Sequence, residues 1–366
     1  MTNSLLLTNE LETTPTGGRE LLCKLNHDIM VDIFNNRLTV IELRKQPIRG
    51  IRSVISAFRG YIDGLSDETI TKVFEIIKYR DIRILIVDGS NFGEIVRIVK
   101  KKFPQIHVYT FFHNVEARFF WGSFKQTKSV HALAVFCANY LAERKTVSFS
   151  DDLICLSKRD SQLLHKLYGR QGTHVSSMAL RDQLDPNVQK GIAPPAQKFA
   201  LFVGGIFYAN LVGIRWFIKH VVPRIGIKIC VVGKGFEIYK NQLEVCGKVE
   251  VIGAVNSLNE WYSNAHFVIA PIFDGSGMKT KVAEALMYGK RIIGTPEAFS
   301  GYEEIAGQVG TVCRTADEFV LAVEDANGMA IKMLDEDLRS IYVERFSYEA
   351  ARSRMVEIVS SCECAL

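Results

Sequence analysis

A glycine-rich segment with two lysines is the part of the sequence best suited to chemistry. After an apolar run that ends at Ala270, the chain continues with Gly275-Ser276-Gly277-Met278-Lys279-Thr280-Lys281 and then an amphipathic stretch that contains Glu284. Glycines let a backbone approach a ligand closely, and the free N–H groups at a helix start attract phosphate. If the helix begins near Gly277, both lysines oppose its dipole unless an anion is bound. The segment therefore predicts a phosphate site; a turn with two solvated lysines is the alternative.

Other candidate residues follow expected strands directly. They are Gly17 and Gly18, Asp88 and Asn91, His113, Gly204 and Gly205, and Gly233 and Lys234. Open α/β sheets bind ligands beyond the carboxyl ends of their strands, so these positions favour a binding site. These residues also have structural interpretations that involve no ligand. A glycine pair often only makes a turn, and a histidine at a strand end can be structural.

The elements that would position these residues alternate between short apolar runs and amphipathic segments, a pattern typical of parallel α/β sheets. We expect strands at residues 4–8, 38–43, 82–87, 106–111, 153–156, 199–203, 227–232, 249–252, 267–270 and 291–294. We expect helices at residues 19–25, 67–78, 92–102, 130–148, 158–168, 210–222, from about 277, and at 350–359. Ser66, Gly169 and Ser347 are expected to cap three of these helices.

A change of composition predicts the domain boundary. Residues 182–198 hold Asp185-Pro186-Asn187, Gly191 and Pro194-Pro195, the most turn-rich stretch of the chain. The length of 366 residues also suits two domains. We expect an N-terminal domain over residues 1–190, a C-terminal domain over residues 191–345, and a final helical segment over residues 346–366.

Composition excludes several classes of protein. Hydrophobic residues make up 48% and charged residues 23%, which excludes disorder and fibrous proteins. The net charge of +5 is too small to indicate nucleic-acid binding. The eight cysteines include no CxxC pair, so we expect reduced thiols in a cytoplasmic protein and no structural zinc. A secretory signal and a spanning segment are not expected.

The segment from Ala270 to Lys290 resembles the donor-nucleotide motif of group 1 glycosyltransferases (glycosyltransferase family 4). Relatives often carry two glutamates separated by seven residues; Glu284 matches the second, whereas Ser276 stands at the place of the first. A branch with a Gly-Ser-Gly-Met-Lys-Thr-Lys pattern, common among surface-polysaccharide enzymes, is more similar. Phe202-Val203-Gly204-Gly205 with Asn210 and Trp216, the Gly233-Lys234-Gly235 turn, and Val251-Ile252-Gly253 extend the resemblance over most of the chain.

The resemblance implies a GT-B fold, in which two Rossmann-like domains with parallel sheets face one another across a cleft. It also implies that the final segment, residues 346–366, crosses back onto the N-terminal domain. It further implies a hexosyltransferase that uses a UDP-sugar or another nucleotide sugar and retains the anomeric configuration, as most relatives do. It implies no permanently bound cofactor and no metal. The acceptor would be a lipid-linked or oligosaccharide substrate in bacterial capsule, exopolysaccharide or O-antigen synthesis.

The resemblance also assigns roles to individual residues. Glu284 would hold the ribose, and Gly204, Gly205, Gly233 and Lys234 would line the donor site. The diphosphate would lie against Lys281, Lys279 and the amides of the loop; Lys279 ranks second because it can point to solvent. Gly17, Gly18 and His113 would lie near the acceptor and the transferred sugar, and Leu258 and Trp261 near the base. The resulting donor-site list is Gly275, Ser276, Gly277, Met278, Lys279, Thr280 and Glu284, with His113 and Lys281 as catalytic candidates.

Charge suggests where the protein works. Residues 1–190 carry a net +7 and residues 191–366 a net −2. Arg44-Lys45, Arg49, Arg52 and Lys100-Lys101-Lys102 occur with Phe58, Tyr61 and Phe103, a mixture that suits an anionic membrane surface. We therefore expect a peripheral protein at the inner face of the plasma membrane; a solvated basic face is the alternative.

Two other functions stay open. The loop between Phe199 and Ile214 has no Arg or Lys, although many relatives use such residues for the diphosphate. Together with Ser276, this leaves room for a non-catalytic GT-B subunit that binds a partner glycosyltransferase. A sugar-nucleotide epimerase of the same fold would instead turn over its nucleotide sugar without an acceptor.

Overall fold

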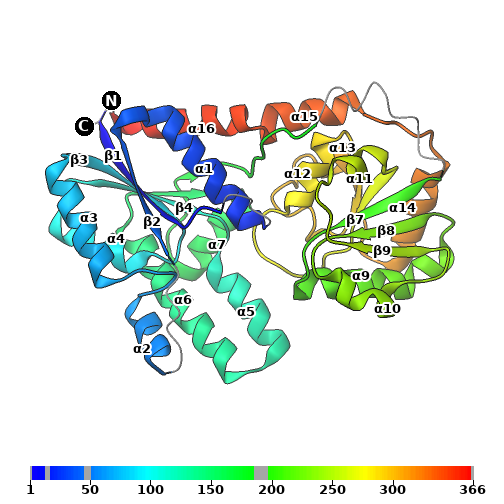
Figure 1. The fold of residues 1–366 in the computed structure, drawn as a ribbon, viewed down its shortest axis with the longest axis horizontal. Coiled ribbons are helices and arrows are strands. Elements are labelled where there is room, and N and C mark those ends of the chain that lie inside the picture. Colours follow the sequence, from blue (N-terminus) through cyan, green and yellow to red (C-terminus); the bar gives the residue numbers. More distant parts are fainter. Residues whose placement is uncertain (1, 13–16, 45–50, 185–196, 364–366) are drawn as a thin grey trace. The chain divides into compact units, whose positions relative to one another are not determined.

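The computed structural model describes residues 2–12, 17–44, 51–184 and 197–363 (Figure 1). Contacts between Cα atoms divide the chain into two compact units. Unit 1 comprises Met1–Met178 together with Ala351–Leu366, and unit 2 comprises Ala179–Ala350. Most of the turn-rich stretch expected as a linker, together with Lys45 and Arg49, lies outside the described residues.

Unit 1 is built on a six-stranded parallel sheet. Its strand order is β2-β1-β3-β4-β5-β6, so the order reverses between β1 and β3. Leu5, Leu6 and Leu7 are at most 1% exposed, as expected for a strand covered on both faces. The strands are β1 (Asn3–Asn9), β2 (Leu38–Leu43), β3 (Ile82–Asp88), β4 (His107–Phe112), β5 (Asp152–Cys155) and β6 (His174–Val175).

Helices connect these strands and bury their apolar faces on the sheet. Ile70, Val73 and Ile77 of one helix and Val96 and Val99 of the next share a core with β1, β2 and β3. Ser66 caps the first of these helices, with its Oγ 3.2 Å from the Thr69 amide nitrogen. The helices are α1 (Gly18–Phe34), η1 (Asn35–Arg37), α2 (Ile51–Arg59), α3 (Asp67–Tyr79), α4 (Gly93–Lys102), α5 (Glu116–Thr127), α6 (Val130–Phe149) and α7 (Lys158–Tyr168).

The last helix, α16 (Tyr348–Glu363), belongs mainly to unit 1. The Tyr109 hydroxyl donates to the carbonyl of Ile358 at 3.3 Å. Arg354 donates to the carbonyl of Ser177 at 2.9 Å. The Ser347 hydroxyl caps the helix by accepting from the Ala350 amide at 3.1 Å, as its sequence predicts.

Unit 2 repeats the architecture with a second six-stranded parallel sheet. Its order is β12-β11-β10-β7-β8-β9, so the order reverses between β10 and β7. The strands are β7 (Phe199–Val203), β8 (Lys228–Val232), β9 (Val249–Gly253), β10 (Phe267–Ala270), β11 (Ile292–Gly294) and β12 (Gly310–Val312). The helices are α9 (Tyr208–His220), η2 (Val222–Arg224), η3 (Phe236–Tyr239), α10 (Lys240–Leu243), α11 (Asn259–Asn264), α12 (Thr280–Met287), α13 (Ala306–Val309), α14 (Ala316–Gly328) and α15 (Glu336–Phe346). The two parallel sheets confirm the predicted α/β class.

Several elements differ from the sequence-based expectation. Helix α1 ends at Phe34 rather than at residue 25, because its buried face continues through Ile29 and Met30. Helix α12 begins at Thr280, and Lys279 occupies the N-cap position, so the glycines before it form a loop rather than the first turn. Helices α2, α5, α14 and α15 were not expected. Among the described residues, no helix is both long and apolar enough to cross a membrane.

Candidate donor site at the carboxyl edge of unit 2

The glycine-rich segment forms the loop between β10 and α12. Gly275 and Gly277 have φ angles of 147° and 65°, in the region that favours glycine. The Gly275 amide donates to the Asp274 carboxylate at 2.9 Å, so a phosphate would have to replace this bond to accept from the same amide. Met278 is 6% exposed and packs against Gly301 rather than facing outward.

Lys281 connects this loop with the one after β7. Its Nζ atom donates to Oδ1 of Asn210 at 3.0 Å and lies 4.5 Å from the ring centroid of Phe202. Asn210 is fixed in turn, because its Nδ2 atom donates to the carbonyl of Gly205 at 2.8 Å. The contact joins residues that follow β10 and β7, the pair of strands between which the order reverses, where ligands bind in open α/β sheets.

The lowered pKa of Lys281 is what a buried lysine without a bound anion should have. The residue is only 6% exposed, and this burial lowers the pKa of its ammonium to about 7, assisted by repulsion from Lys279 and opposed by Glu284. Burying a charged group without a counter-charge is costly, so a bound diphosphate would restore the usual preference for the protonated form.

Glycines leave the space in front of Lys281 open. A Cβ atom on Gly204 would lie 2.6 Å from Nδ2 of Asn210 and 3.3 Å from Nζ of Lys281, whereas one on Gly205 would meet nothing within 4 Å. Gly233, with φ of 148°, packs so closely on Gly204 that a side chain would strike the Gly204 carbonyl. The carbonyl of Lys234 accepts from the Ile206 amide at 3.0 Å, and the Lys234 side chain is exposed.

Glu284 lies one turn after Lys281 on α12, so the two residues share a side of the helix. Its Oε2 atom accepts a hydrogen bond from the Tyr262 hydroxyl at 2.7 Å. The Tyr262 ring stacks on Tyr288 with centroids 5.0 Å apart and planes 1° from parallel. Burial raises the pKa of Glu284, and the bond from Tyr262 and the charge of Lys281 oppose that rise.

Lys279 differs from Lys281. Its Nζ atom lies 3.0 Å from Oε1 of Glu297 and donates to the carbonyl of Gly277 at 2.9 Å. Its side chain is 11% exposed, so the expectation that it can point to solvent is wrong. A lysine that is already paired with a carboxylate has less charge to offer a phosphate, so Lys279 is better placed to hold the loop closed.

In unit 1, His113 directly follows β4 and is buried. Its Nε2 atom lies 3.1 Å from Oδ1 of Asp88 and 3.6 Å from Sγ of Cys23. Thr8 and Asn26 donate to the two carboxylate oxygens of Asp88 at 3.0 and 2.8 Å. Burial would raise the pKa of Asp88, but the charge and hydrogen bond of His113, with the hydrogen bonds of Asn26 and Cys23, hold it below its usual value. With its side chain 3% exposed, His113 lies inside unit 1 rather than at an open surface.

Within the described part of the chain, Cys23, Asp88 and His113 also form a group whose ligand atoms could hold a metal ion, because these atoms all lie within 4.8 Å of one another. Two facts favour a closed hydrogen-bond network instead. Both oxygens of Asp88 already accept hydrogen bonds, and burial raises the pKa of the Cys23 thiol, which opposes the thiolate that a metal needs.

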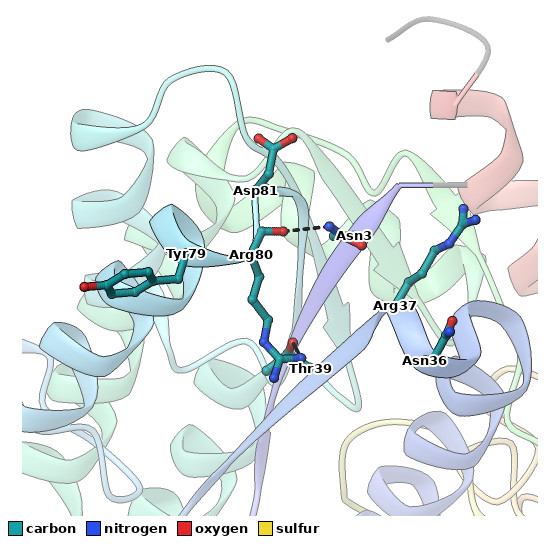
Figure 2. Close-up of a pocket in the computed structure, with 7 residues that line it drawn as sticks. All are labelled: Asn3, Asn36, Arg37, Thr39, Tyr79, Arg80 and Asp81. Carbon is teal, nitrogen blue, oxygen red and sulfur yellow. Dashed lines mark hydrogen bonds between the residues drawn. The ribbon is translucent and has the colours of Figure 1, made fainter.

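Gly17 and Gly18 precede and open α1, and Gly17 is the N-cap residue of that helix. A separate cavity of about 370 Å³ lies near the opposite edge of the sheet, where β1, β2 and β3 begin (Figure 2). There the carbonyl of Arg80 accepts from Asn3 at 2.6 Å, and Arg80 donates to Thr39 at 3.4 Å. No residue predicted to act in the site lines this cavity.

The sequence did not reveal two features of the candidate donor site. One is the contact of Tyr262 with Glu284, and the other is the hydrogen bond between Asn210 and Lys281. Both contacts span long stretches of chain, so a local pattern does not reveal them. The only signal for Asn210 was its place at a helix start after a glycine pair. Trp261, which was expected beside the base, contacts the ring of Phe199 at 6.1 Å.

Residues 197–335 match the family model described as Glycosyl transferases group 1. A search of curated proteins by sequence found no match.

Solved structures resemble the chain over nearly its whole length. Sucrose-phosphate synthase from Thermosynechococcus elongatus is 12% identical, with 100% of each chain covered and a TM-score of 0.76. HepE of Anabaena, solved in complex with UDP-glucose, is 13% identical, with 98% of this chain and 99% of that chain covered and a TM-score of 0.67. The lipopolysaccharide outer core galactosyltransferase WaaB, in its apo form, is 13% identical, with 98% and 99% covered and a TM-score of 0.65.

Both parallel sheets thus have counterparts in these structures, and the sequence match falls on the part of the chain that holds Asn210, Lys281 and Glu284. The chain has the GT-B fold, and its residues 197–335 match the model of the group 1 glycosyl transferases.

Proposed function

We propose that the protein transfers a sugar from a nucleoside-diphosphate sugar, with UDP as the nucleotide, to an acceptor hydroxyl. Unit 2 would hold the donor and unit 1 the acceptor. The observation that carries the proposal is the buried Lys281 ammonium beside Asn210 and the open backbone of Gly204. Solved relatives whose titles name UDP and UDP-glucose support the choice of nucleotide.

In this proposal the chain acts mainly on the leaving group. When the bond from the anomeric carbon to the diphosphate breaks, negative charge grows on the phosphate oxygens. Lys281 would stabilise that charge in a site that is largely shielded from water, where electrostatic stabilisation is strongest. Glu284 would accept hydrogen bonds from the ribose hydroxyls, with Tyr262 holding its carboxylate in position. Retention of the anomeric configuration, as the resemblance implies, belongs to the same proposal.

The acceptor would be assembled at an anionic membrane during surface-polysaccharide synthesis, with unit 1 docked on it. Helix α2 exposes Val54, Ile55 and Phe58 by 40, 56 and 41% on one face. It packs against α6, as does α5, whose Trp121 is 37% exposed (Figure 1). Exposed cations accompany this apolar surface on the same helices and just after α5, namely Arg52, Arg59, Lys125 and Lys128.

The cations that we expected at the membrane do not all fit this surface. Lys100 is paired with Asp151 at 2.8 Å, so it is not a free basic residue. Lys100 also lies at the wrong end of α4 for this surface. It is in the last turn of that helix, whereas the end of α2 packs near the first turn, where Gly60 lies against Glu94. Arg44 is 3.3 Å from Glu10. Helix α2, rather than the lysine run, is therefore the proposed docking element.

Isothermal titration calorimetry with UDP, followed by a hydrolysis assay with UDP-sugars, tests the donor proposal. Lys281→Met should weaken UDP binding at least about tenfold, because a charge-assisted contact to phosphate is lost. Lys219→Met, which changes an exposed lysine of the same unit, is the matched control and should bind normally. UDP binding without release of sugar from any UDP-sugar would instead favour the non-catalytic subunit.

Flotation with vesicles tests the membrane proposal. Vesicles that contain phosphatidylglycerol should capture the protein, and Ile55→Ser with Phe58→Ser should release it. Tyr79→Ser, which changes an aromatic residue that is 89% exposed on α3, is the control and should leave capture unchanged. Equal capture of the double variant and the wild type would remove α2 from the docking surface.

A further inference from the structure

A second cavity, of about 630 Å³, lies within unit 1 at the carboxyl edge of its sheet. Arg19 at the start of α1, Asn91 after β3 and Glu116 at the start of α5 reach it from the ends of β1, β3 and β4. Asp63 and the surrounding loop lie between α2 and α3 and complete its wall. The volume falls in the range of small-molecule sites, and the strand order reverses here, between β1 and β3.

The polar residues of this cavity are already paired in a way that disfavours phosphate. The Arg19 guanidinium lies 2.9 Å from the Asp63 carboxylate and 3.9 Å from that of Glu116. Its charge is therefore offset before any ligand arrives. Asp67 is a third carboxylate in the lining, so acidic residues outnumber the two arginines, Arg19 and Arg59. A phosphate placed beside these carboxylates would meet repulsion.

Two buried polar atoms among the described residues of the cavity have no hydrogen-bond partner, namely Oδ1 of Asn91 and Nε of Arg19. Asn91 is 2% exposed, and its Nδ2 atom donates to Asp63 at 2.6 Å. Because a carboxylate only accepts, this bond fixes the amide with its oxygen turned away from Asp63. Two residues that line the cavity thus hold one unused acceptor and one unused donor, both covered by neighbouring atoms.

Sugar hydroxyls suit both kinds of atom, because a hydroxyl both donates and accepts; the phosphate oxygens of a phosphomonoester dianion only accept and cannot pair with Oδ1 of Asn91. Glu116 adds to this preference, since burial raises its pKa to about 7 against the pull of Arg19, so it can either accept from or donate to a hydroxyl near neutral pH. Phe120, Val135 and Ala138 supply an apolar wall that suits the C–H face of a sugar ring.

We propose that this cavity binds an uncharged sugar of the acceptor, so that the acceptor end presented to the donor is a glycan rather than a bare lipid phosphate. The inference rests on the proposed function. Helix α2 is consistent with it, because Ser53, Ser56 and Ala57 line the cavity while Val54, Ile55 and Phe58 are exposed. One helix would thus bring a lipid surface and a sugar-binding cavity together.

Saturation-transfer difference NMR on the full chain tests the inference. The probes are glucose, galactose, mannose, N-acetylglucosamine, maltose and lactose, with inorganic phosphate and glycerol 3-phosphate as competitors. At least one neutral sugar should give a signal that neither phosphate compound displaces. Asp63→Asn should weaken that sugar about tenfold or more, because a charge-assisted hydrogen bond is lost.

Asp81→Asn is the matched control. Asp63 and Asp81 both have left-handed backbones, with φ of 48° and 45°, which asparagine tolerates, and both pair with an arginine. Asp81 lies outside the cavity, so its variant should bind sugar like the wild type. UDP affinity, measured on each variant, reports on folding and on the donor site independently.

The inference is overturned if no sugar binds, if Asp63→Asn binds sugar as well as the wild type does, or if phosphate displaces the sugar. Normal UDP binding alongside any of these results would leave the donor proposal standing. Loss of UDP binding in the wild type would instead count against the donor proposal and not against the cavity.

Discussion

Replacing Lys281 by methionine should make the unliganded protein more stable, although it removes a hydrogen bond. Burial lowers the pKa of Lys281 from 10.5 to about 7. At 1.36 kcal/mol per pKa unit, this shift lowers the free energy of unfolding by roughly 5 kcal/mol below pH 7. The variant leaves Oδ1 of Asn210 without its donor, which costs about 1–3 kcal/mol. The expected net gain is therefore roughly 2–4 kcal/mol at pH 6.

The gain should depend on pH in a defined direction. Because the folded-state pKa of Lys281 is lowered, the unfolded chain binds more protons between about pH 7 and pH 10.5, so wild-type stability rises with pH in that window. The advantage of Lys281→Met should shrink by roughly 2–3 kcal/mol between pH 6 and pH 9. Titrating groups that Lys281 does not influence, such as Lys290, are common to both proteins and cancel in the difference.

Urea unfolding followed by tryptophan fluorescence measures this difference. Trp216 and Trp261 lie in unit 2, whereas Trp121 lies in unit 1, so a Trp121→Phe background makes the signal specific for unit 2. Lys219→Met serves as the control and should change stability by less than about 0.5 kcal/mol at any pH, as exposed substitutions do. A Lys281→Met variant that is less stable than the wild type, or whose advantage does not vary with pH, would refute the reasoning.

Three further variants address the neighbours of Lys281. Glu284→Gln keeps the shape but loses the charge-assisted bonds to ribose, so UDP affinity should fall by about 1.5–3 kcal/mol in calorimetry; unchanged affinity would remove Glu284 from the site. Gly204→Ala should strongly weaken UDP binding, since its Cβ would crowd Asn210 and Lys281, whereas Gly205→Ala should bind normally; equal affinities would contradict the close approach. Asn210→Asp supplies a counter-charge, so it should raise the pKa of Lys281 and weaken UDP binding; tighter binding would show that the lysine needs no free charge.

Most strands of both sheets were predictable because each is a mainly apolar run between turn signals, whereas the short strands β6 (His174–Val175) and β12 (Gly310–Val312) were not expected. Phe267–Ala270 and Phe199–Val203 have the predicted bounds. Helices α14 and α15 have start signals in Thr315 and Asp335, whose side chains accept from the following amides, but neither signal was used.

The site was predictable only in part, for a physical reason. The lysines and Glu284 share one segment, so their spacing could be interpreted locally. Which lysine is free of a counter-charge depends on Glu297 and Asn210, which lie 18 and 71 positions away in the chain. The pairing of Arg19 with Asp63, 44 positions apart, is of the same kind. Such contacts depend on the packing of loops at a sheet edge, which a sequence pattern does not encode.

Proton uptake on UDP binding tests the role of Lys281 most directly. At pH 8 a lysine with a pKa of about 7 is mostly neutral, and a bound diphosphate should protonate it. Calorimetry in two buffers of different ionisation enthalpy should therefore show an uptake of up to about 0.9 proton per UDP. Lys281→Met should lose this uptake and bind UDP at least about tenfold more weakly. Equal affinity and equal proton uptake in the two proteins would contradict the assignment of the donor diphosphate to Lys281.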